Sequence, residues 1–278
     1  MKIPFAYTLV LGILGLGLIQ TAEGASRKEV KPPPQSAAQG TSVLTVGATI
    51  VPHAAILGLV KDDLAAQNIE LKIVEFTDYV MPNSALIAGD LDANFFQHLP
   101  FLEENPTWKA ALSPAFGVHV EPLGLYSNLI KTIEDLKDGA SIAIPNDPSN
   151  GGRALLLLQS KGFITLNPAA GLKATPRDIT DNPKNLKFHE LEAAQLPRSL
   201  GDVDAAVING NYALEAGFNP LEDALIIEGA ESPYINYLVV RKGDEEDPRI
   251  KALEAVLCSQ KVKDYINKTW NGSVRGIF

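Results

Sequence analysis

Cysteine is almost absent from this chain, because its 278 residues include one, Cys258. A single thiol excludes an intrachain disulfide and any zinc site built from several cysteines. Cys258 follows Val256 and Leu257 in a predicted helix. We therefore expect it to be a small core residue rather than a reactive group.

The sequence also lacks the short motifs of common catalytic and nucleotide-binding sites. It contains no G-x-S-x-G nucleophile motif, no Walker loop and no G-x-G-x-x-G dinucleotide motif. No nucleophile is paired with an evident base, and carboxylates such as Glu190, Glu192 and Asp244 are expected to be solvated or structural charges. We predict that the protein is not an enzyme and uses no cofactor.

Basic residues are scarcer than acidic ones, with 24 Lys and Arg against 33 Asp and Glu, for a formal net charge of -9. This balance, without a basic stripe, argues against nucleic acid or an anionic membrane surface as a partner. Hydrophobic residues make up 46% of the chain. This ordinary globular composition suits one large domain or two lobes.

The first 25 residues have the pattern of a secretory signal peptide. Lys2 precedes an apolar run over 3–19, and small residues follow up to Ala25. Because the run is nearly long enough to span a bilayer, an uncleaved anchor is the alternative. Residues 26–42 contain three consecutive prolines with Gln, Ser, Ala and Gly, and predict a disordered linker. We expect an exported protein, periplasmic or otherwise extracytoplasmic.

Strands and helices alternate along the remaining chain. The predicted strands are short and apolar, and cover 43–48, 71–76, 91–96, 118–121, 123–126, 141–145, 186–191, 205–208 and 235–241. The predicted helices cover 53–67, 82–89, 99–105, 132–137, 152–161, 196–200, 211–216 and 249–268. This alternation predicts an α/β fold with parallel sheets. Because the pattern restarts near residue 127, we expect two lobes with a cleft between them.

Polar side chains follow several of these strands, in 94–98, 146–153 and 209–211. Ligands of open α/β sheets bind beyond the carboxyl ends of the strands. The three polar stretches therefore predict one binding site in the cleft.

Arg153 is the most informative candidate. The stretch 145–158 runs from a loop rich in Pro and Gly into an apolar helix, and the predicted helix start places Arg153 in the first turn. A helix N-terminus favours anions and disfavours a cation. A ligand carboxylate would explain the arginine, because the guanidinium and the loop N–H groups would both bind it. The alternative is an exposed arginine paired with Asp147.

Aromatic and amide side chains near the same strand ends are further candidates. Phe96 and His98 either face a ligand or belong to the core and cap the next helix. Tyr79 either stacks on a ligand or packs between the lobes. Asn209 and Asn211 either bind a ligand's amino and carboxylate groups or cap the following helix.

His119 and Glu121 alternate on one predicted strand and therefore share a face. They suggest metal ligands, or a carboxylate for a ligand's ammonium group. The four histidines of the chain are scattered singly, and no H-E-x-x-H motif is present. We therefore predict no metal site.

Six stretches occur in the order found in a known family, at 46–53 (VGATIVPH), 95–98 (FFQH), 118–122 (VHVEP), 144–155 (IPNDPSNGGRAL), 192–198 (EAAQLPR) and 206–213 (AVINGNYA). In these stretches the chain resembles the methionine-binding lipoproteins of the NlpA type, the substrate-binding proteins of methionine ABC importers. The resemblance covers residues 43–278. It implies the two-lobed periplasmic-binding-protein fold, type II-like, with two crossover strands. The first lobe would comprise 43–126 and 240–278, and the second 127–239.

The resemblance also implies a ligand site and partners. Arg153 would hold the methionine carboxylate, with Asn150 and Asn209 beside it at the polar end. Tyr79, Phe96 and His98 would surround the thioether. Weaker candidates for ligand binding are His119, Glu121 and Asn211. The expected partners are methionine, as the L or D form or in a dipeptide, and an ABC permease. We expect a monomer.

The chain departs from this family at its N-terminus, because residues 1–42 contain no cysteine that a lipid could modify. We therefore expect a protein that is either soluble or tethered by an uncleaved helix. A surface or adhesion module, or an enzyme on the same two-lobed fold, is the alternative function.

Overall fold

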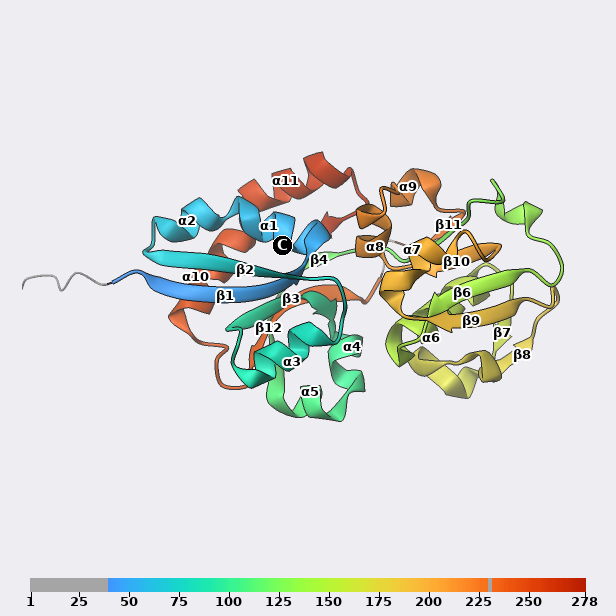
Figure 1. The fold of residues 1–278 in the computed structure, drawn as a ribbon, viewed down its shortest axis with the longest axis horizontal. Coiled ribbons are helices and arrows are strands. Elements are labelled where there is room, and N and C mark those ends of the chain that lie inside the picture. The colour runs from blue at the N-terminus through green and yellow to red at the C-terminus, as the bar shows by residue number, and fades with distance from the viewer. Residues whose placement is uncertain (1–39, 230–231) are drawn as a thin grey trace, which may run out of the picture. The chain divides into compact units, whose positions relative to one another are not determined.

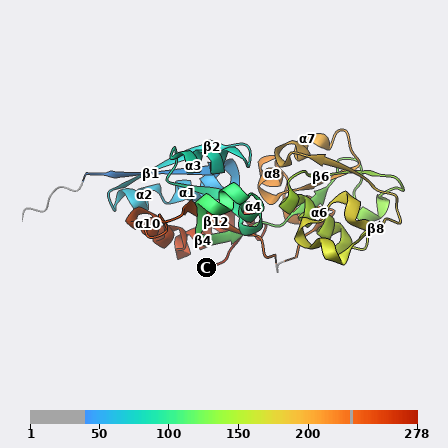
Figure 2. The same ribbon diagram turned by 90° about the horizontal axis from the view of Figure 1, so that it is seen from below.

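The computed structural model describes residues 40–229 and 232–278. The predicted signal peptide and nearly all of the predicted linker lie outside the described residues. Within the described ranges, no helix combines the length and the apolar character needed to cross a membrane. Two main β-sheets, each with helices on both faces, make up the described part of the chain (Figures 1 and 2).

The first sheet has six strands in the order β13-β4-β12-β3-β1-β2. Its strands are β1 (Ser42–Thr49), β2 (Ile69–Phe76), β3 (Ala93–His98), β4 (Leu112–Val120), β12 (Ile235–Arg241) and β13 (Arg275–Gly276). β1 is parallel to β2 and β3, whereas β12 is antiparallel to both β3 and β4. A strand that returns from the other sheet is thus inserted beside the parallel strands.

The second sheet has five strands in the order β11-β5-β10-β6-β9. Its strands are β5 (Gly124–Tyr126), β6 (Ser141–Pro145), β9 (Lys187–Leu191), β10 (Ala205–Ile208) and β11 (Ile226–Ile227). β6 is parallel to β9 and β10, and β5 is antiparallel to β10 and β11. A separate two-stranded pair consists of β7 (Thr165–Leu166) and β8 (Ile179–Asp181).

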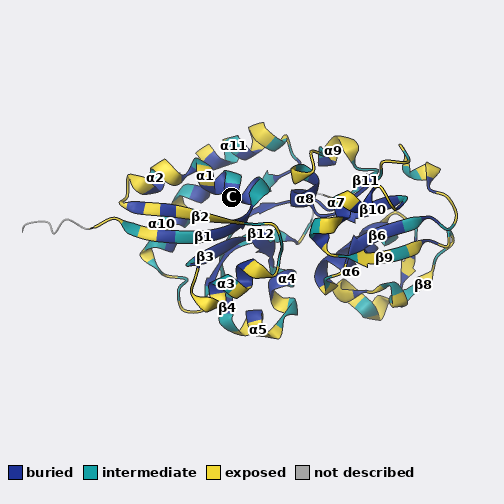
Figure 3. Ribbon diagram, viewed as in Figure 1, coloured by how far each residue is buried: buried dark blue, intermediate teal, exposed yellow. Residues whose placement is uncertain are grey.

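Helices cover both faces of the first sheet. One face carries α1 (Ala55–Leu59), α2 (Lys61–Ala65), α10 (Pro248–Leu257) and α11 (Gln260–Trp270), and the other carries α3 (Met81–Ala88), α4 (Leu99–Glu104) and α5 (Pro106–Ala111). Every residue of β3 is therefore buried, as Figure 3 shows for the central strands. Because neighbouring residues of a strand point to opposite faces, Phe95 packs with the first group of helices and Phe96 with the second.

The second sheet is covered in the same way. α6 (Pro148–Ser160) packs on one face, whereas α7 (Leu196–Ser199) and α8 (Gly210–Glu215) pack on the other. The remaining helical segments are short: α9 (Pro220–Asp223), Ile50–Ala54, Ile133–Asp135, Pro168–Lys173, Pro176–Asp178 and Ala193–Gln195.

The chain passes between the sheets twice, after β4 and before β12. β5 pairs with strands of the second sheet and β12 with strands of the first. The expected lobe boundaries at 126/127 and 239/240 thus place β5 and most of β12 in the wrong sheet. The structure puts the two crossings at 121–123 and between β11 and β12.

Several predicted elements begin or end elsewhere; β4, for example, begins at Leu112 rather than at 118, and the predicted helix over 53–67 is divided. α6 begins at Pro148 rather than at 152, because the Asp147 side chain accepts the Asn150 N–H and caps it there. The predicted helix over 249–268 is two helices, because Ser259 caps the start of α11. β3 runs to His98, so the polar residues that we expected after this strand belong to the strand itself.

Candidate functional site

A cavity of about 340 Å³, a volume that includes space open to solvent, lies between residues of the two lobes. Seven of the nine predicted site residues line it: Tyr79, Phe96, His98, Glu121, Asn150, Arg153 and Asn209. The other lining residues are Gln97, Phe101, Gly210 and Asn236. Most lie at the carboxyl end of a strand or at the start of the next helix, as expected for an open α/β sheet.

Three side chains form a hydrogen-bonded chain across the lobes. His98 Nδ1 accepts the Phe101 N–H at 3.2 Å, so the neutral imidazole carries its proton on Nε2 and donates to Asn150 Oδ1 at 3.1 Å. Asn209 Nδ2 donates to the same oxygen at 2.8 Å. Burial and the nearby Arg153 lower the pKa of His98 to about 3, so the ring is neutral at pH 7.

Asn209 leaves one buried polar atom without a partner. Its Oδ1 accepts no hydrogen bond from the described residues, and Asn209 is buried in the wall of the cavity. Buried polar atoms in native proteins are nearly always hydrogen-bonded. This oxygen is therefore a place where a ligand N–H would bind.

Arg153 is buried and ion-paired, but not with Asp147. Its Nε and Nη2 donate to the two carboxylate oxygens of Glu228, and Nη2 also donates to the Glu121 carbonyl at 2.9 Å. The ring of Tyr234 covers the guanidinium, with Cζ 4.1 Å from the ring centroid. The alternative of an exposed arginine paired with Asp147 is therefore wrong, because Arg153 is buried and Asp147 caps α6.

The helix start also changes the reason for placing Arg153 in the site. Arg153 lies in the second turn of α6, since the helix begins at Pro148. The preference of a first turn for anions therefore does not explain this arginine. The reason to place Arg153 in the site is instead that its side chain is buried and lines the cavity.

Aromatic rings form another part of the cavity wall. Tyr79 lies 5.8 Å from Phe96 and 5.7 Å from Phe101 between ring centroids. The Tyr79 hydroxyl donates to Asn211 Oδ1 at 2.5 Å, which joins the first lobe to the second. Asn211 itself does not line the cavity, so the structure places it behind Tyr79.

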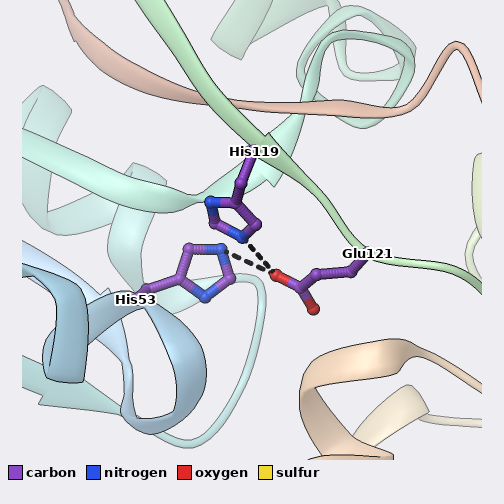
Figure 4. A group of neighbouring side chains, drawn as sticks. All are labelled: His53, His119 and Glu121. Atoms are coloured by element: carbon purple, nitrogen blue, oxygen red, sulfur yellow. Dashed lines mark hydrogen bonds and ion pairs between the residues drawn. The ribbon is translucent and has the colours of Figure 1, made fainter. Parts of the chain in front are cut away.

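Glu121 is held between two buried histidines, as Figure 4 shows. Its Oε1 lies 2.7 Å from His119 Nε2 and 3.3 Å from His53 Nε2. His53 Nδ1 lies 2.7 Å from the Thr49 hydroxyl, and His53 Nε2 lies 3.2 Å from Asn236 Oδ1. His119 does not line the cavity and instead contacts Glu121, which does.

Burial sets the protonation of this cluster. Burial lowers the pKa of His53 to about 4 and that of His119 to about 3, and raises the pKa of the Glu121 carboxyl. Both imidazoles are therefore neutral at pH 7, and each can donate an Nε2–H to Glu121. The three donor atoms lie within 4.8 Å of one another and could ligate a metal ion. The hydrogen bonds to Glu121 account for the approach of both Nε2 atoms to its carboxylate, so we assign no ion.

Four residues that line the cavity or contact Arg153 escaped the sequence analysis: Phe101, Glu228, Tyr234 and Asn236. β12 is antiparallel to β3, and Asn236 pairs with His98 in the register. The amino end of an antiparallel strand thus lies beside the carboxyl end of its parallel neighbour. Tyr234 and Asn236 at the start of the predicted strand 235–241 could have been found by this rule, whereas no sequence pattern marks Glu228.

The two sheets, the two chain crossings and the cavity between the lobes define a two-lobed α/β fold of the kind found in periplasmic substrate-binding proteins. The chain belongs to the NlpA lipoprotein family, whose model matches residues 44–278. Among its relatives, the D-methionine-binding lipoprotein MetQ of Escherichia coli K12 is 44% identical over 212 residues, which are 75% of this chain and 78% of the relative.

Solved structures share the fold. A nutrient-binding protein from Burkholderia cenocepacia bound to methionine has a TM-score of 0.81 and 44% identity, over 84% of this chain and all of that one. The periplasmic substrate-binding protein of an ABC transporter from Coxiella burnetii has a TM-score of 0.79 and 43% identity, over 84% of this chain and 99% of that one. These similarities confirm the predicted family and the predicted fold.

Proposed function

We propose that this protein captures methionine in the cavity between its lobes and delivers it to an ABC importer. The observation that carries the proposal is the cavity itself, where three features meet: an arginine whose Nη1 donates to no described residue, an amide oxygen with no partner among the described residues, and aromatic rings. A free amino acid with an apolar side chain has groups that match all three. The methionine bound to the Burkholderia protein and the name of the E. coli relative support this choice of ligand.

In this proposal the polar groups recognise the backbone of the amino acid. Arg153 binds the carboxylate, and Asn209 Oδ1 accepts from the ammonium group. Glu121, fixed by His119 and His53, supplies a further acceptor at the cavity wall. Tyr79, Phe96 and Phe101 surround the thioether, because aromatic rings make favourable contacts with sulfur.

Several features expected from the sequence stay predictions within this proposal. They are an extracytoplasmic location, a monomeric state and a permease as partner. The Coxiella protein is named as the binding protein of an ABC transporter, which supports the permease.

Calorimetric titration of the protein with L-methionine, after refolding to remove endogenous ligand, tests the proposal. We expect tight binding that Arg153→Ala weakens about 30-fold or more, because it removes a buried charge-assisted contact. Arg177→Ala, the same change at an exposed position of the second lobe, should bind like the wild type.

D-methionine and a methionine dipeptide are titrated beside L-methionine. If the wild type binds none of them, the methionine proposal fails while the family and fold stand. If Arg153→Ala binds as tightly as the wild type, the carboxylate role of Arg153 fails. Circular dichroism must show that the variant is folded, because the change leaves Glu228 without its partner.

A further inference from the structure

We propose that Glu228 is a positioning residue of the ligand site. It holds the Nε and Nη2 side of Arg153, so that Nη1 is the nitrogen presented to the ligand's carboxylate. This inference rests on the proposed function, because it assumes that Arg153 binds a carboxylate. Glu228 itself touches no ligand in this scheme and acts through Arg153.

The hydrogen bonds of the guanidinium support this role. An arginine has five N–H groups. Nε donates to Glu228 Oε1 at 2.9 Å, and Nη2 donates once to Glu228 Oε2 and once to the Glu121 carbonyl. No described residue accepts from Nη1, so two N–H groups remain for a ligand. The bidentate contact expected between this arginine and a ligand carboxylate is thus already made with Glu228.

Glu228 is itself fixed between the two chain crossings. Its N–H donates to the Leu123 carbonyl at 2.9 Å, and the Leu123 N–H approaches Glu228 Oε2 at 3.4 Å. Glu121 and Leu123 belong to the first crossing, whereas Glu228 and Tyr234 belong to the second. The guanidinium therefore lies against both connections between the lobes. Its plane is set by the carboxylate on one edge and by the Tyr234 ring on one face.

Burial makes it costly to separate Arg153 from Glu228. The Arg153 and Glu228 side chains are 5% and 17% exposed. An uncompensated charge at such depth is costly, so the pair is expected to stay together when a ligand binds. The ligand carboxylate then meets a fixed, single-nitrogen contact, and its affinity depends on how accurately Glu228 orients that nitrogen.

The test compares two ligands that differ at the carboxylate. L-methioninol keeps the ammonium group and the thioether of L-methionine but has a hydroxymethyl group in place of the carboxylate. In Glu228→Gln, we expect L-methionine to bind about tenfold or more weakly, the scale of one charge-assisted hydrogen bond. L-methioninol should lose less than about threefold, since it makes no carboxylate contact with Nη1.

The ratio of the two dissociation constants separates positioning from general damage. A merely structural effect would weaken both ligands equally and leave the ratio unchanged, which would overturn the proposal. Tighter L-methionine binding by Glu228→Gln would also overturn it, because Glu228 would then be a competitor of the ligand. If the wild type binds neither ligand, the proposed function fails and the positioning role fails with it.

Two further variants complete the experiment. Glu222→Gln makes the same change at an exposed glutamate of the second lobe and should leave both constants unchanged. Glu228→Asp keeps the charge but shortens the side chain by one methylene. It should change the ratio in the same direction as Glu228→Gln by a smaller factor, and it replaces that variant if the glutamine protein does not fold.

Discussion

At the scale of single residues, Gly152 occupies one of the most crowded positions in α6. A Cβ atom built on it would lie 2.1 Å from the carbonyl oxygen of Leu172. Neighbouring Gly151 would place its Cβ 2.8 Å from the carbonyl oxygen of Pro145. These glycines therefore allow the backbone on either side to approach the helix, and they lie inside it rather than in a loop before it.

Gly152→Ala is expected to lower the free energy of unfolding by about 1–3 kcal/mol, because the backbone of Leu172 must move. Gly58→Ala makes the same change in α1, where a Cβ atom meets nothing within 4 Å and the site is exposed. That variant should be more stable than the wild type by up to about 1 kcal/mol, since alanine favours a helix. Urea unfolding of both variants checks the opposite signs, and a loss of stability in neither would contradict the crowding at Gly152.

Site residues were predictable from sequence where a local rule applied. Asn150 and Asn209 follow strands, so their place at the cavity follows from the position of strand ends. Arg153 was placed in the site for a reason that the helix start removes. Glu228 was missed because its role depends on a partner 75 residues away, and no local pattern records such a contact.

At the scale of elements, the N-terminus of α6 links helix stability to the cavity. Asp147 Oδ1 accepts both the backbone N–H of Asn150 at 2.9 Å and its side-chain Nδ2 at 2.8 Å. The first bond caps the helix, and the second orients the Asn150 amide whose oxygen meets His98 and Asn209. The loss of the Asp147 carboxylate should therefore affect both the stability of α6 and the cavity.

Asp147→Ala should lower the free energy of unfolding by about 1 kcal/mol through the lost cap. It should also weaken methionine binding several-fold, because the Asn150 amide is released. Asp147→Asn keeps a capping oxygen and should retain most of both properties. Asp247→Ala removes the equivalent cap from α10, which does not line the cavity, and should lower stability alone. Unfolding curves and titrations of the three variants give the comparison, and unchanged affinity in Asp147→Ala would refute the link.

Most strands were predictable because apolar alternation is a local signal, and β1, β6, β10 and β12 lie close to their expected ranges. The start of α6 was missed because Gly151 and Gly152 look like a loop until the close approach of Leu172 is known. The break between α10 and α11 was missed because one capping serine separates two stretches of similar periodicity. In each case a tertiary contact or a single capping residue, rather than local composition, decides where the helix begins or ends.

At the scale of the whole molecule, the pairing of distant strands decides which lobe a segment joins. β5 and β12 each lie next to a crossing, and either sheet could accept them on sequence alone. Their hydrogen-bond partners lie 80 or more residues away for β5 in β10, and more than 100 residues away for β12 in β4. The number of lobes was therefore predictable from the repeated α/β pattern, whereas the crossing points were not.

One contact between the lobes is expected to depend on pH. Glu104 in α4 accepts the Ser149 N–H of α6 at 2.9 Å. Burial and the nearby Asp147 carboxylate raise the pKa of Glu104 from 4.5 to about 7, although the bond from Ser149 opposes this shift. The folded protein therefore holds this proton more tightly than the unfolded chain does. Consequently the contribution of Glu104 to stability falls as the pH rises from about 4.5 to about 7.

Glu104→Gln removes this titration while keeping an oxygen that can accept from Ser149. The free energy of unfolding of the variant, relative to the wild type, should therefore be higher at pH 8 than at pH 5. Glu103→Gln is the matched control, because Glu103 is exposed and its pair with Lys109 spans 3.8 Å. Such an exposed pair contributes little to stability, so the control should show no comparable change between the two pH values.

Urea unfolding at pH 5 and at pH 8 measures, for each variant, the difference in the free energy of unfolding from the wild type. A gain at pH 8 confined to Glu104→Gln would identify a carboxylate whose charge opposes lobe contact. A loss at pH 8 in Glu104→Gln would show that the Ser149 bond outweighs burial and that the charged Glu104 carboxylate favours the contact. An equal response of both variants would contradict the prediction, because the pH dependence would then not come from Glu104.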